Sequence, residues 1–463
     1  MSPLRLRLFA TVFVLFFTHI TSQAAGRPPN IVFILADDLG YGDIGCYGQK
    51  KIQTPNIDRL AAQGIRFTQC YAGSTVCAPS RCALMTGLHC GHAFIRGNAA
   101  VYLRPSDVTV AKLLQQNGYA TGLIGKWGLG DPGTTGVPSK HGFDTFYGYL
   151  NQTHAHNYYP DHLWRHEEKV PLQNVQEKGV ASKRVEYAPD LLREEAIRFV
   201  EANKAKPFFL YFASIIPHVN NERTRAEGNG HEVPTDAPYT NEPWPQTEKN
   251  KAAMITRLDA DIGKLLAKLT ELKLDNDTIV FFSSDNGPHK EGGNDPEFFQ
   301  SSGQFRGFKR SLTDGGIRVP GIVRYPGVAK PGTVSDHVWA FWDFLPTACE
   351  LAGVKPPDGI DGISIAPTIT GRGTPKTHEF LYWEFHEGGT VQAVRHGNWK
   401  GIRPAPGKPL QLYDLATDLR ETNNVADKNP DIVAKIETYL KTARTESKEF
   451  PIVEPKTPAK KKK

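Results

Sequence analysis

The sequence predicts an α/β fold in which helices sandwich a large, mainly parallel β-sheet, followed by a smaller antiparallel sheet with one helix. First, continuous apolar segments of strand length recur along the chain, as expected of strands that are buried on both faces. Second, these segments alternate with segments of helical periodicity, which is the pattern of parallel sheets. Third, from about residue 366 the apolar segments become short, aromatic and alternating, which is typical of antiparallel strands.

The first 24 residues are predicted to be a cleavable signal peptide. Arg5 and Arg7 precede an apolar run over residues 8–17, and a small-x-small pattern ends at Ala24, as in secretory signals. A membrane anchor is the alternative, but the run is shorter than the about 20 apolar residues that span a bilayer. We therefore expect an exported protein, periplasmic or secreted, without a transmembrane segment in the mature chain.

Residues 25–365 are predicted to form the larger domain, which contains the parallel sheet. Its first two helices end at Gly64 and Gly118, and Ser106 or Asp107 caps the second of them, in agreement with helix start and stop signals. The strands that we expect cover residues 30–38, 119–127, 207–218 and 278–287. The helices that alternate with them cover residues 54–64, 106–118, 188–204 and 252–272.

Residues 366–448 are predicted to form a small C-terminal α+β subdomain. The subdomain's predicted strands lie within residues 379–387, 391–403 and 410–418, and its helix covers 430–445.

The larger domain contains one long predicted loop, between the strand at 207–218 and the helix at 252–272. Residues 219–248 are rich in Asn, Glu, Pro and Gly, and loops of this length often form a lid or rim.

The net charge of +6 is concentrated at the two ends of the chain. The signal peptide carries +2 and residues 451–463 carry +4, so the remainder has no net charge. A balanced body argues against a nucleic-acid-binding surface. Residues 449–463 end in four lysines and are predicted to be a basic, disordered tail.

The cysteine content excludes a disulfide scaffold, because six cysteines are too few for a chain of 463 residues. Export permits disulfides, and five of the six cysteines lie between residues 46 and 90, so one local bridge is expected, with a pairing that the sequence does not assign. The six are Cys46, Cys70, Cys77, Cys82, Cys90 and Cys349.

Polar side chains stand at the ends of the predicted strands, and in parallel sheets ligands bind outside the carboxyl ends of the strands. Singly, each of these residues is an ordinary turn residue. Together, Asp37, Asp38, Asp285 and Asn286 supply only hard oxygen ligands, which suit Ca²⁺ or Mg²⁺ and are poor for zinc. Lys126 and His218 end the other two strands, so that one crevice is predicted to hold all six groups.

The stretch "CAPSRCALMTG" at residues 77–87 is the most specific signal in the chain. It resembles the signature C-x-P-S-R with a downstream T-G of the sulfatase family, within the alkaline-phosphatase-like superfamily. The resemblance continues through "NIVFILADDLGYGDIGCYG", "DNG", "GFKRSLTDGGIRVP" and "LYDLATDLRETNNVA", and so covers nearly the whole mature chain. The chain looks most similar to carbohydrate sulfatases of the arylsulfatase and N-acetylgalactosamine sulfatase type.

The resemblance implies a modified nucleophile and makes residues 25–365 a catalytic sulfatase domain. Cys77 is expected to be oxidised to formylglycine by a formylglycine-generating or anaerobic sulfatase-maturing enzyme. The hydrated aldehyde has two hydroxyl groups, of which one attacks sulfur and the other later expels sulfate. Pro79 in the first helical turn directs the amide groups of the helix start toward the sulfate.

The resemblance also implies the roles of the charged residues. Cys77 joins the four oxygen ligands around one ion, Ca²⁺ with Mg²⁺ as the alternative, which acts as Lewis acid and template. Arg81 is expected to steady the formylglycine and the metal ligands. Lys126 and Lys309 are expected to bind the sulfate, and His218 to protonate the leaving oxygen.

One position departs from the family pattern. The family usually has G-K-W-H-L-G, whereas this chain has "GKWGLG" with Gly128, so the histidine that contacts the formylglycine hydroxyl is missing. We hypothesise that His154 or His156 places a substitute imidazole there. His289 and Asp295, in the loop after the "DNG" motif, are candidates for binding sugar hydroxyls.

These observations predict a sulfatase that hydrolyses sulfate monoesters, on carbohydrate with galactose or N-acetylgalactosamine units. One alternative is a phosphatase or phosphodiesterase of the same superfamily, although such relatives use Thr or Ser with two zinc ions and Cys77 argues against them. Another alternative is a catalytically impaired protein that binds sulfated glycans, an alternative that Gly128 leaves open.

Overall fold

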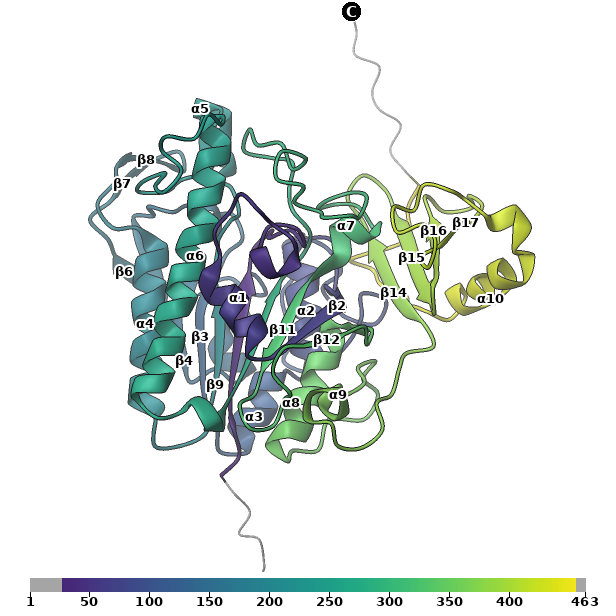
Figure 1. Ribbon diagram of the computed structural model, residues 1–463, viewed down its shortest axis with the longest axis horizontal. Coiled ribbons are helices and arrows are strands. Elements are labelled where there is room, and N and C mark those ends of the chain that lie inside the picture. Colours follow the sequence, from purple (N-terminus) through teal and green to yellow (C-terminus); the bar gives the residue numbers. More distant parts are fainter. Residues whose placement is uncertain (1–26, 455–463) are drawn as a thin grey trace, which may run out of the picture.

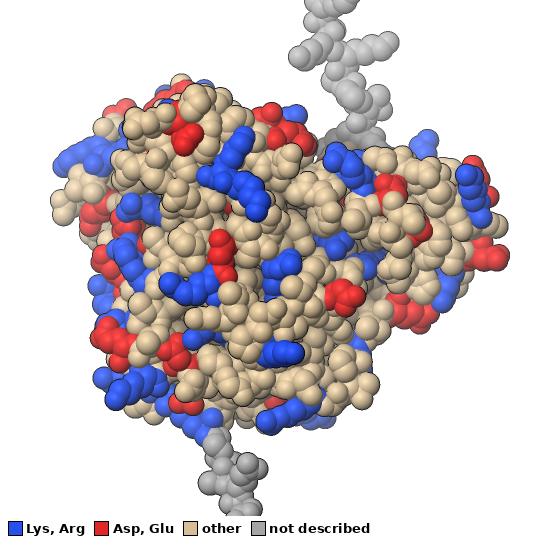
Figure 2. Space-filling view, in the orientation of Figure 1, with Lys and Arg blue, Asp and Glu red and all other residues tan. Residues whose placement is uncertain are grey.

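The computed structural model describes residues 27–454. The predicted signal peptide, residues 1–24, and the lysine-rich residues 455–463 therefore lie outside the described residues. Lys and Arg mix with Asp and Glu over the face of the molecule in Figure 2, in agreement with the balanced charge of the body. None of the helices between residues 27 and 454 is long and apolar enough to cross a membrane.

An 11-stranded sheet forms the centre of the molecule, in the order β12-β2-β11-β10-β1-β9-β3-β4-β5-β6 with β13 paired to β2 (Figure 1). The five strands from β10 to β4 run parallel, whereas β11 is antiparallel to both of its neighbours, β10 and β2. The fold class predicted from the sequence is therefore confirmed. The strands are β1 (Asn30–Ala36), β2 (Ile65–Tyr71), β3 (Ala120–Lys126), β4 (Thr145–Tyr149), β5 (His162–Arg165), β6 (Glu168–Pro171), β9 (Phe208–Ala213), β10 (Thr278–Ser284), β11 (Arg318–Arg324), β12 (Thr333–Ser335) and β13 (Trp339–Ala340).

Helices cover both faces of this sheet, which is why its central strands are apolar throughout. All seven residues of β1 are buried, and its alternate residues enter two different cores. Val32 and Ile34 pack with α1 (Pro55–Ala62), α4 (Ala188–Asn203) and α6 (Gln246–Glu271). Ile31 and Phe33 pack with α2 (Cys77–Thr86), α3 (Val110–Gln116) and α8 (Phe344–Ala352).

The small C-terminal sheet is antiparallel, as predicted, and lies at one end of the molecule in Figure 1. The large-domain core extends past the predicted boundary at residue 365, because Ile369 of α9 (Ala366–Thr370) is buried with α8. The elements of the small unit are β14 (Leu381–Phe385), β15 (Val391–His396), β16 (Trp399–Arg403), β17 (Gln411–Asp414) and α10 (Pro430–Leu440).

Two surface segments are more ordered than the sequence predicted. The expected loop 219–248 contains α5 (Asn221–Glu227), since the Asn220 side chain accepts a hydrogen bond from Arg223 N and caps the helix. Residues 449–454 pack against the small sheet, where Phe450 is buried and Val453 O accepts a hydrogen bond from Thr390 N. The predicted tail therefore does not include these six residues.

The expectation of a local disulfide is wrong, because all six cysteines are free thiols. Most of them are buried one by one in the core rather than opposite another cysteine. Cys90, for example, directs its Sγ to the carbonyl oxygen of Gly73 at 2.9 Å.

A buried ion pair joins the small sheet to the large domain. Lys400 of β16 is fully buried, and its Nζ lies 2.8 Å from Asp314 Oδ1 and 3.6 Å from Glu421 Oε1. Asp314 begins α7 (Asp314–Ile317), at the end of the loop that contains Lys309. The small sheet thus helps to hold a loop of the active site.

We expect Lys400→Met to destabilise the protein by about 3 kcal/mol, because it leaves Glu421 buried without the ammonium group that it pairs with, and Asp314 with Arg318 but without Lys400. Chemical denaturation of the purified protein measures the change. Lys435→Met, which removes an exposed lysine paired with Glu379, is the control and should change stability by less than about 1 kcal/mol. Equal effects of the two substitutions would contradict the structural role of Lys400.

Candidate active site

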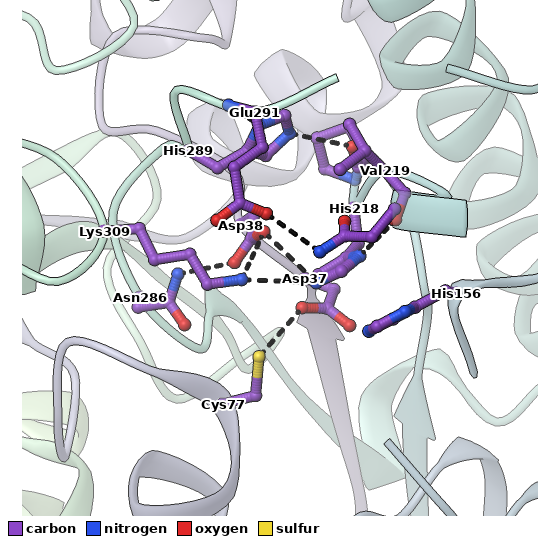
Figure 3. Close-up of polar contacts among 12 residues, drawn as sticks. Asp37, Asp38, Cys77, His156, His218, Val219, Asn286, His289, Glu291 and Lys309 are labelled. Carbon is purple, nitrogen blue, oxygen red and sulfur yellow. Dashed lines mark hydrogen bonds and ion pairs between the residues drawn. The ribbon is translucent and has the colours of Figure 1, made fainter. Parts of the chain in front are cut away.

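The candidate active site lies at the carboxyl edge of the central parallel strands. In the sheet β10, β1, β9 and β3 lie side by side, so their carboxyl ends meet. The predicted polar groups are therefore neighbours although they are far apart in the sequence, as Figure 3 shows for Asp37, Asp38, His218 and Asn286. They are Asp285 and Asn286 after β10, Asp37 and Asp38 after β1, His218 after β9, and Lys126 at the end of β3.

Cys77 is the first residue of α2, and only 2% of its surface is exposed. Its Sγ lies 3.6 Å from Asp37 Oδ1. Burial raises the pKa of the thiol to about 12, although Lys126 and Lys309 oppose this shift. The thiol is therefore protonated at neutral pH and a poor nucleophile. The start of α2 nevertheless favours an anion beside this residue, because the positive end of the helix dipole lies there.

Each carboxylate of the site is paired with a cation from another part of the chain. The cations are Arg81 in α2, Lys126 at the end of β3 and Lys309 in the loop before α7. All three side chains are buried. Buried charges persist only when they are compensated in this way. The contacts are Arg81 Nε and NH2 to Asp285 Oδ2 at 3.0 and 2.8 Å, Lys126 Nζ to Asp37 Oδ2 at 2.7 Å, and Lys309 Nζ to Asp38 Oδ2 at 2.8 Å.

The carboxylates nevertheless differ in how well they are compensated. Burial alone would raise the pKa of Asp37, but the charges of Lys126 and Arg81 hold it well below its usual range. Asp285 shows the opposite result, because burial and the neighbouring Asp37 raise its pKa to about 7 despite Arg81. The site therefore favours one further positive charge close to Asp285.

The residues present fit a hard divalent cation. Asn286 Nδ2 donates hydrogen bonds to Asp38 Oδ1 and Gly287 O, whereas its Oδ1 is buried and has no hydrogen-bond partner among residues 27–454. Ligand atoms of Asp37, Asp38, Cys77 and His218 all lie within 4.8 Å of one another. Carboxylate and amide oxygens are the ligands that Ca²⁺ and Mg²⁺ prefer.

His218 faces the same space through one ring nitrogen. Its Nδ1 lies 2.7 Å from Val219 O and therefore carries the proton, so Nε2 points toward Lys309 Nζ at 3.2 Å. Burial, and then the charge of Lys309, lower the pKa of His218 well below 6.5. The imidazole is thus neutral and hydrogen-bonded to an ammonium group, an arrangement that can pass a proton to a bound ligand.

Comparison with known proteins identifies the family. Residues 29–354 match the family described as Sulfatase, and residues 303–447 match N-sulphoglucosamine sulphohydrolase, C-terminal. The chain belongs to the sulfatase family. This sulfatase is a sulfuric ester hydrolase of a family that generally uses formylglycine and a divalent metal ion, and Cys77 lies among residues that fit such an ion.

Relatives of known name resemble this sulfatase over most of their length. Arylsulfatase A of Bos taurus is 33% identical, over 87% of this chain and 84% of that protein. The N-acetylgalactosamine-6-O-sulfatase of Bacteroides thetaiotaomicron is 29% identical, over 90% and 94%. The crystal structure of Ps i-CgsB has a TM-score of 0.78 at 29% identity, covering 90% of this chain and 93% of that one. A second structure of that protein contains k-i-k-neocarrahexaose.

The Gln152 side chain fills the space that a Cβ atom at position 128 would need. Gly128 has a φ of 78°, a left-handed conformation that favours glycine. A Cβ added there would lie 2.2 Å from Gln152 Nε2. The departure from the family pattern is therefore accommodated by a neighbouring polar side chain that no sequence signal had indicated.

The two histidines proposed as substitutes lie in different places. The His156 ring stacks on His218, with ring centroids 4.9 Å apart and 12° between the planes. Its Nδ1 lies 3.1 Å from Glu222 Oε2. His154 instead stacks on His162, with centroids 4.5 Å apart. Of the two, His156 belongs to the site (Figure 3).

The two predicted sugar-binding residues of the "DNG" loop also lie differently. His289 is buried behind His218, with ring centroids 6.4 Å apart, and its Nδ1 accepts a hydrogen bond from Glu291 N. Asp295 is exposed, and its backbone N donates to Glu248 Oε1. His289 thus supports the site from within, and Asp295 contacts none of the catalytic groups described above.

Sequence reasoning missed Glu222, Glu291 and Arg310 at the rim of the site. A signal was nonetheless available for two of them, because Arg310 directly follows Lys309 and Glu291 comes two residues after His289. Glu222 lies in α5, inside a segment that we had expected to be a loop.

We expect removal of divalent cations to lower the melting temperature Tm of this sulfatase, because a cation bound at 100 times its Kd adds about 2.7 kcal/mol of stability. Thermal unfolding with chelator, and then with excess Ca²⁺ or Mg²⁺, measures the effect. Asn286→Ala should reduce the stabilisation by the added cation, whereas Asn423→Ala on the exposed surface should leave it unchanged. A Tm that is the same with and without chelator would contradict a cation site.

Proposed function

We propose that this sulfatase removes sulfate from sulfated carbohydrate with galactose or N-acetylgalactosamine units, using a formylglycine made from Cys77 and one calcium ion. The observation that carries the proposal is the position of Cys77, buried at the start of α2 among Asp37, Lys126 and Lys309. The names of the N-acetylgalactosamine-6-O-sulfatase and of the complex with k-i-k-neocarrahexaose support carbohydrate as the substrate class.

The protein's own residues bind and orient the sulfate ester. Lys126 and Lys309 belong to the same buried cluster as Cys77, through their contacts to Asp37 and Asp38, and their ammonium groups bind the sulfate oxygens in this proposal. Arg81 holds Asp285 through two hydrogen bonds to one carboxylate oxygen and so fixes the arrangement of the oxygen ligands. The pair of His218 and Lys309 supplies the proton that the leaving oxygen needs.

The two groups that complete the site have defined contributions. Formylglycine supplies a hydrated aldehyde, whose two hydroxyl groups serve attack on sulfur and release of sulfate. Calcium supplies a Lewis acid for a sulfate oxygen, held by Asp37, Asp38, Asp285 and Asn286. We propose calcium rather than magnesium because four protein side chains can supply oxygen ligands here, whereas Mg²⁺ usually keeps several waters.

Export and maturation follow from the same proposal. Residues 1–24 act as the signal peptide, so the protein is periplasmic or secreted. Because only 2% of Cys77 is exposed after folding, a formylglycine-generating or anaerobic sulfatase-maturing enzyme has to act on the chain before it folds.

We further propose that His156 replaces the imidazole missing at position 128. Glu222 Oε2 accepts a hydrogen bond from His156 Nδ1, which orients the ring, as carboxylates do for catalytic histidines. The stacking on His218 places the other nitrogen of His156 beside the proton-transfer pair. His156 and Glu222 together then act in proton transfer during sulfate release.

Mass spectrometry of the peptide that contains Cys77 tests the central proposal. Protein from a host with a maturing enzyme should show the aldehyde mass, and Cys77→Ala should lower turnover of sulfate esters by about a thousandfold or more. Cys82→Ala, at a buried cysteine of the same helix, is the matched control and should remain active. An unmodified thiol would favour a glycan-binding protein, and matured enzyme that cleaves only phosphate esters would favour the phosphatase alternative.

His156→Ala should lower kcat by about 100-fold, the usual contribution of a general acid or base. His154→Ala should change kcat by less than about threefold, because its ring nitrogens have no hydrogen-bond partner among the described residues and are not oriented for proton transfer. Steady-state kinetics of both variants on one sulfate ester measures the difference. Similar kcat values for the two variants would rule out the substitution by His156.

A further inference from the structure

A pocket of about 520 Å³ opens beside the catalytic groups. Its size falls within the range of small-molecule sites. Apart from Gly292 and Gly293, the residues that line it have polar or charged side chains, and none of the catalytic or metal-binding residues named above is among them. The polar lining residues that matter here are Asn221, Arg225, Lys290, Glu291 and Arg310.

Three residues that line this pocket lie within three positions of active-site residues in the sequence. Asn221 comes three residues after His218, and Arg310 directly follows Lys309. Glu291 comes two residues after His289 and lies close enough to Lys309 for that ammonium group to lower its pKa. Figure 3 shows Glu291 beside His289 at the rim of the site. A group bound in the pocket is therefore adjacent to an ester held by Lys309.

The polar groups of the pocket are held in place by one another. Glu291 accepts hydrogen bonds from Asn221 Nδ2 at 3.1 Å and from Arg310 NH1. Arg310 Nε in turn donates to Glu387 Oε2 at 2.7 Å. Arg310 also has a φ of 73°, a left-handed conformation that is unfavourable for arginine and typical of functional sites.

One hydrogen-bond acceptor in this wall is left unused. The Oδ1 atom of Asn221 is buried and has no hydrogen-bond partner among residues 27–454. A buried polar atom without a partner is costly and is usually explained by a missing ligand or water. A hydroxyl group in the pocket would supply the missing donor.

The charges around the pocket cancel. The cations are Arg225, Lys290 and Arg310, and the carboxylates are those of Glu291 in the wall and of Glu222 and Glu387, which pair with Arg225 and Arg310. A second anionic group of a substrate would therefore meet as many carboxylates as cations. Alternating donors and acceptors of this kind instead match the hydroxyl groups of a sugar, each of which both donates and accepts.

We propose that this pocket binds a sugar ring through Asn221, Glu291 and Arg310, and that the ring carries no charged group other than the sulfate to be removed. The inference rests on the proposed sulfatase function and defines its substrate class further. It favours substrates with neutral, monosulfated units over units that contain a second sulfate or a carboxylate.

Kinetics with three substrate classes tests this proposal: monosulfated galactose and N-acetylgalactosamine, the same sugars with a second sulfate, and 4-nitrophenyl sulfate, which has no sugar. The wild-type enzyme should have a kcat/KM at least about tenfold higher for the best monosulfated sugar than for its disulfated form. Glu291→Gln and Arg310→Gln should each reduce kcat/KM for that sugar at least about tenfold more than for 4-nitrophenyl sulfate. Each substitution removes a charged partner of a hydrogen bond to the sugar, and 4-nitrophenyl sulfate has no sugar to form that bond.

Arg165→Ala is the matched control, because Arg165 pairs with Glu195 at a side-chain exposure of 44%, close to the 41% of Arg310. It should leave the ratio of the two kcat/KM values unchanged. If Arg310→Gln does not fold, the nearly isosteric Glu291→Gln carries the test. Equal losses on sugar and aryl sulfates, or a wild-type preference for disulfated sugars, would overturn the inference alone. Wild-type enzyme without turnover of any sulfate ester would overturn the proposed function itself.

Discussion

The structure depends on burying three carboxylates at the ends of two neighbouring strands. Asp37, Asp38 and Asp285 are fully buried, where an isolated negative charge would be strongly disfavoured. Their position is fixed by the parallel register of β1 and β10, so the chain has to bring cations to them. It does so from three elements, α2, β3 and the loop before α7, and the arrangement of these elements follows from that requirement.

The same constraint explains the position of the nucleophile. Arg81 reaches Asp285 from α2, and this contact places the first residue of the helix, Cys77, beside Asp37. The helix start and the cations then create a site that favours anions, although the carboxylates alone would repel a sulfate ester. A bound divalent cation adds to this balance, which is why an unpartnered oxygen of Asn286 at this point is informative.

The periphery of the site is built by segments that continue from its centre. His156 and Glu222 lie on one side, next to His218, and Glu291 with Arg310 lies on another. The small C-terminal sheet contributes from outside through Lys400 and Asp314. Specificity can therefore vary in the loops while the buried charge pairs stay constant, in agreement with a fold that carries different sites on one scaffold.

The sequence by itself determined the fold class and the residue types that stand at the strand ends. Apolar runs that end in Asp37, Lys126, His218 and Asp285 predict buried parallel strands, and the motif that begins at Cys77 indicates the sulfatase family. These features are local, because strand periodicity and short motifs depend on neighbouring residues alone.

Only the tertiary structure decided what depends on contacts between distant segments. It separated His156 from His154, put Glu291 rather than Asp295 at the rim, and left the cysteines unpaired. It also placed β11 between β10 and β2, antiparallel to both. The direction of a side chain on a loop, and the pairing of strands or thiols, are set by packing against residues far away in the chain, and periodicity does not contain that information.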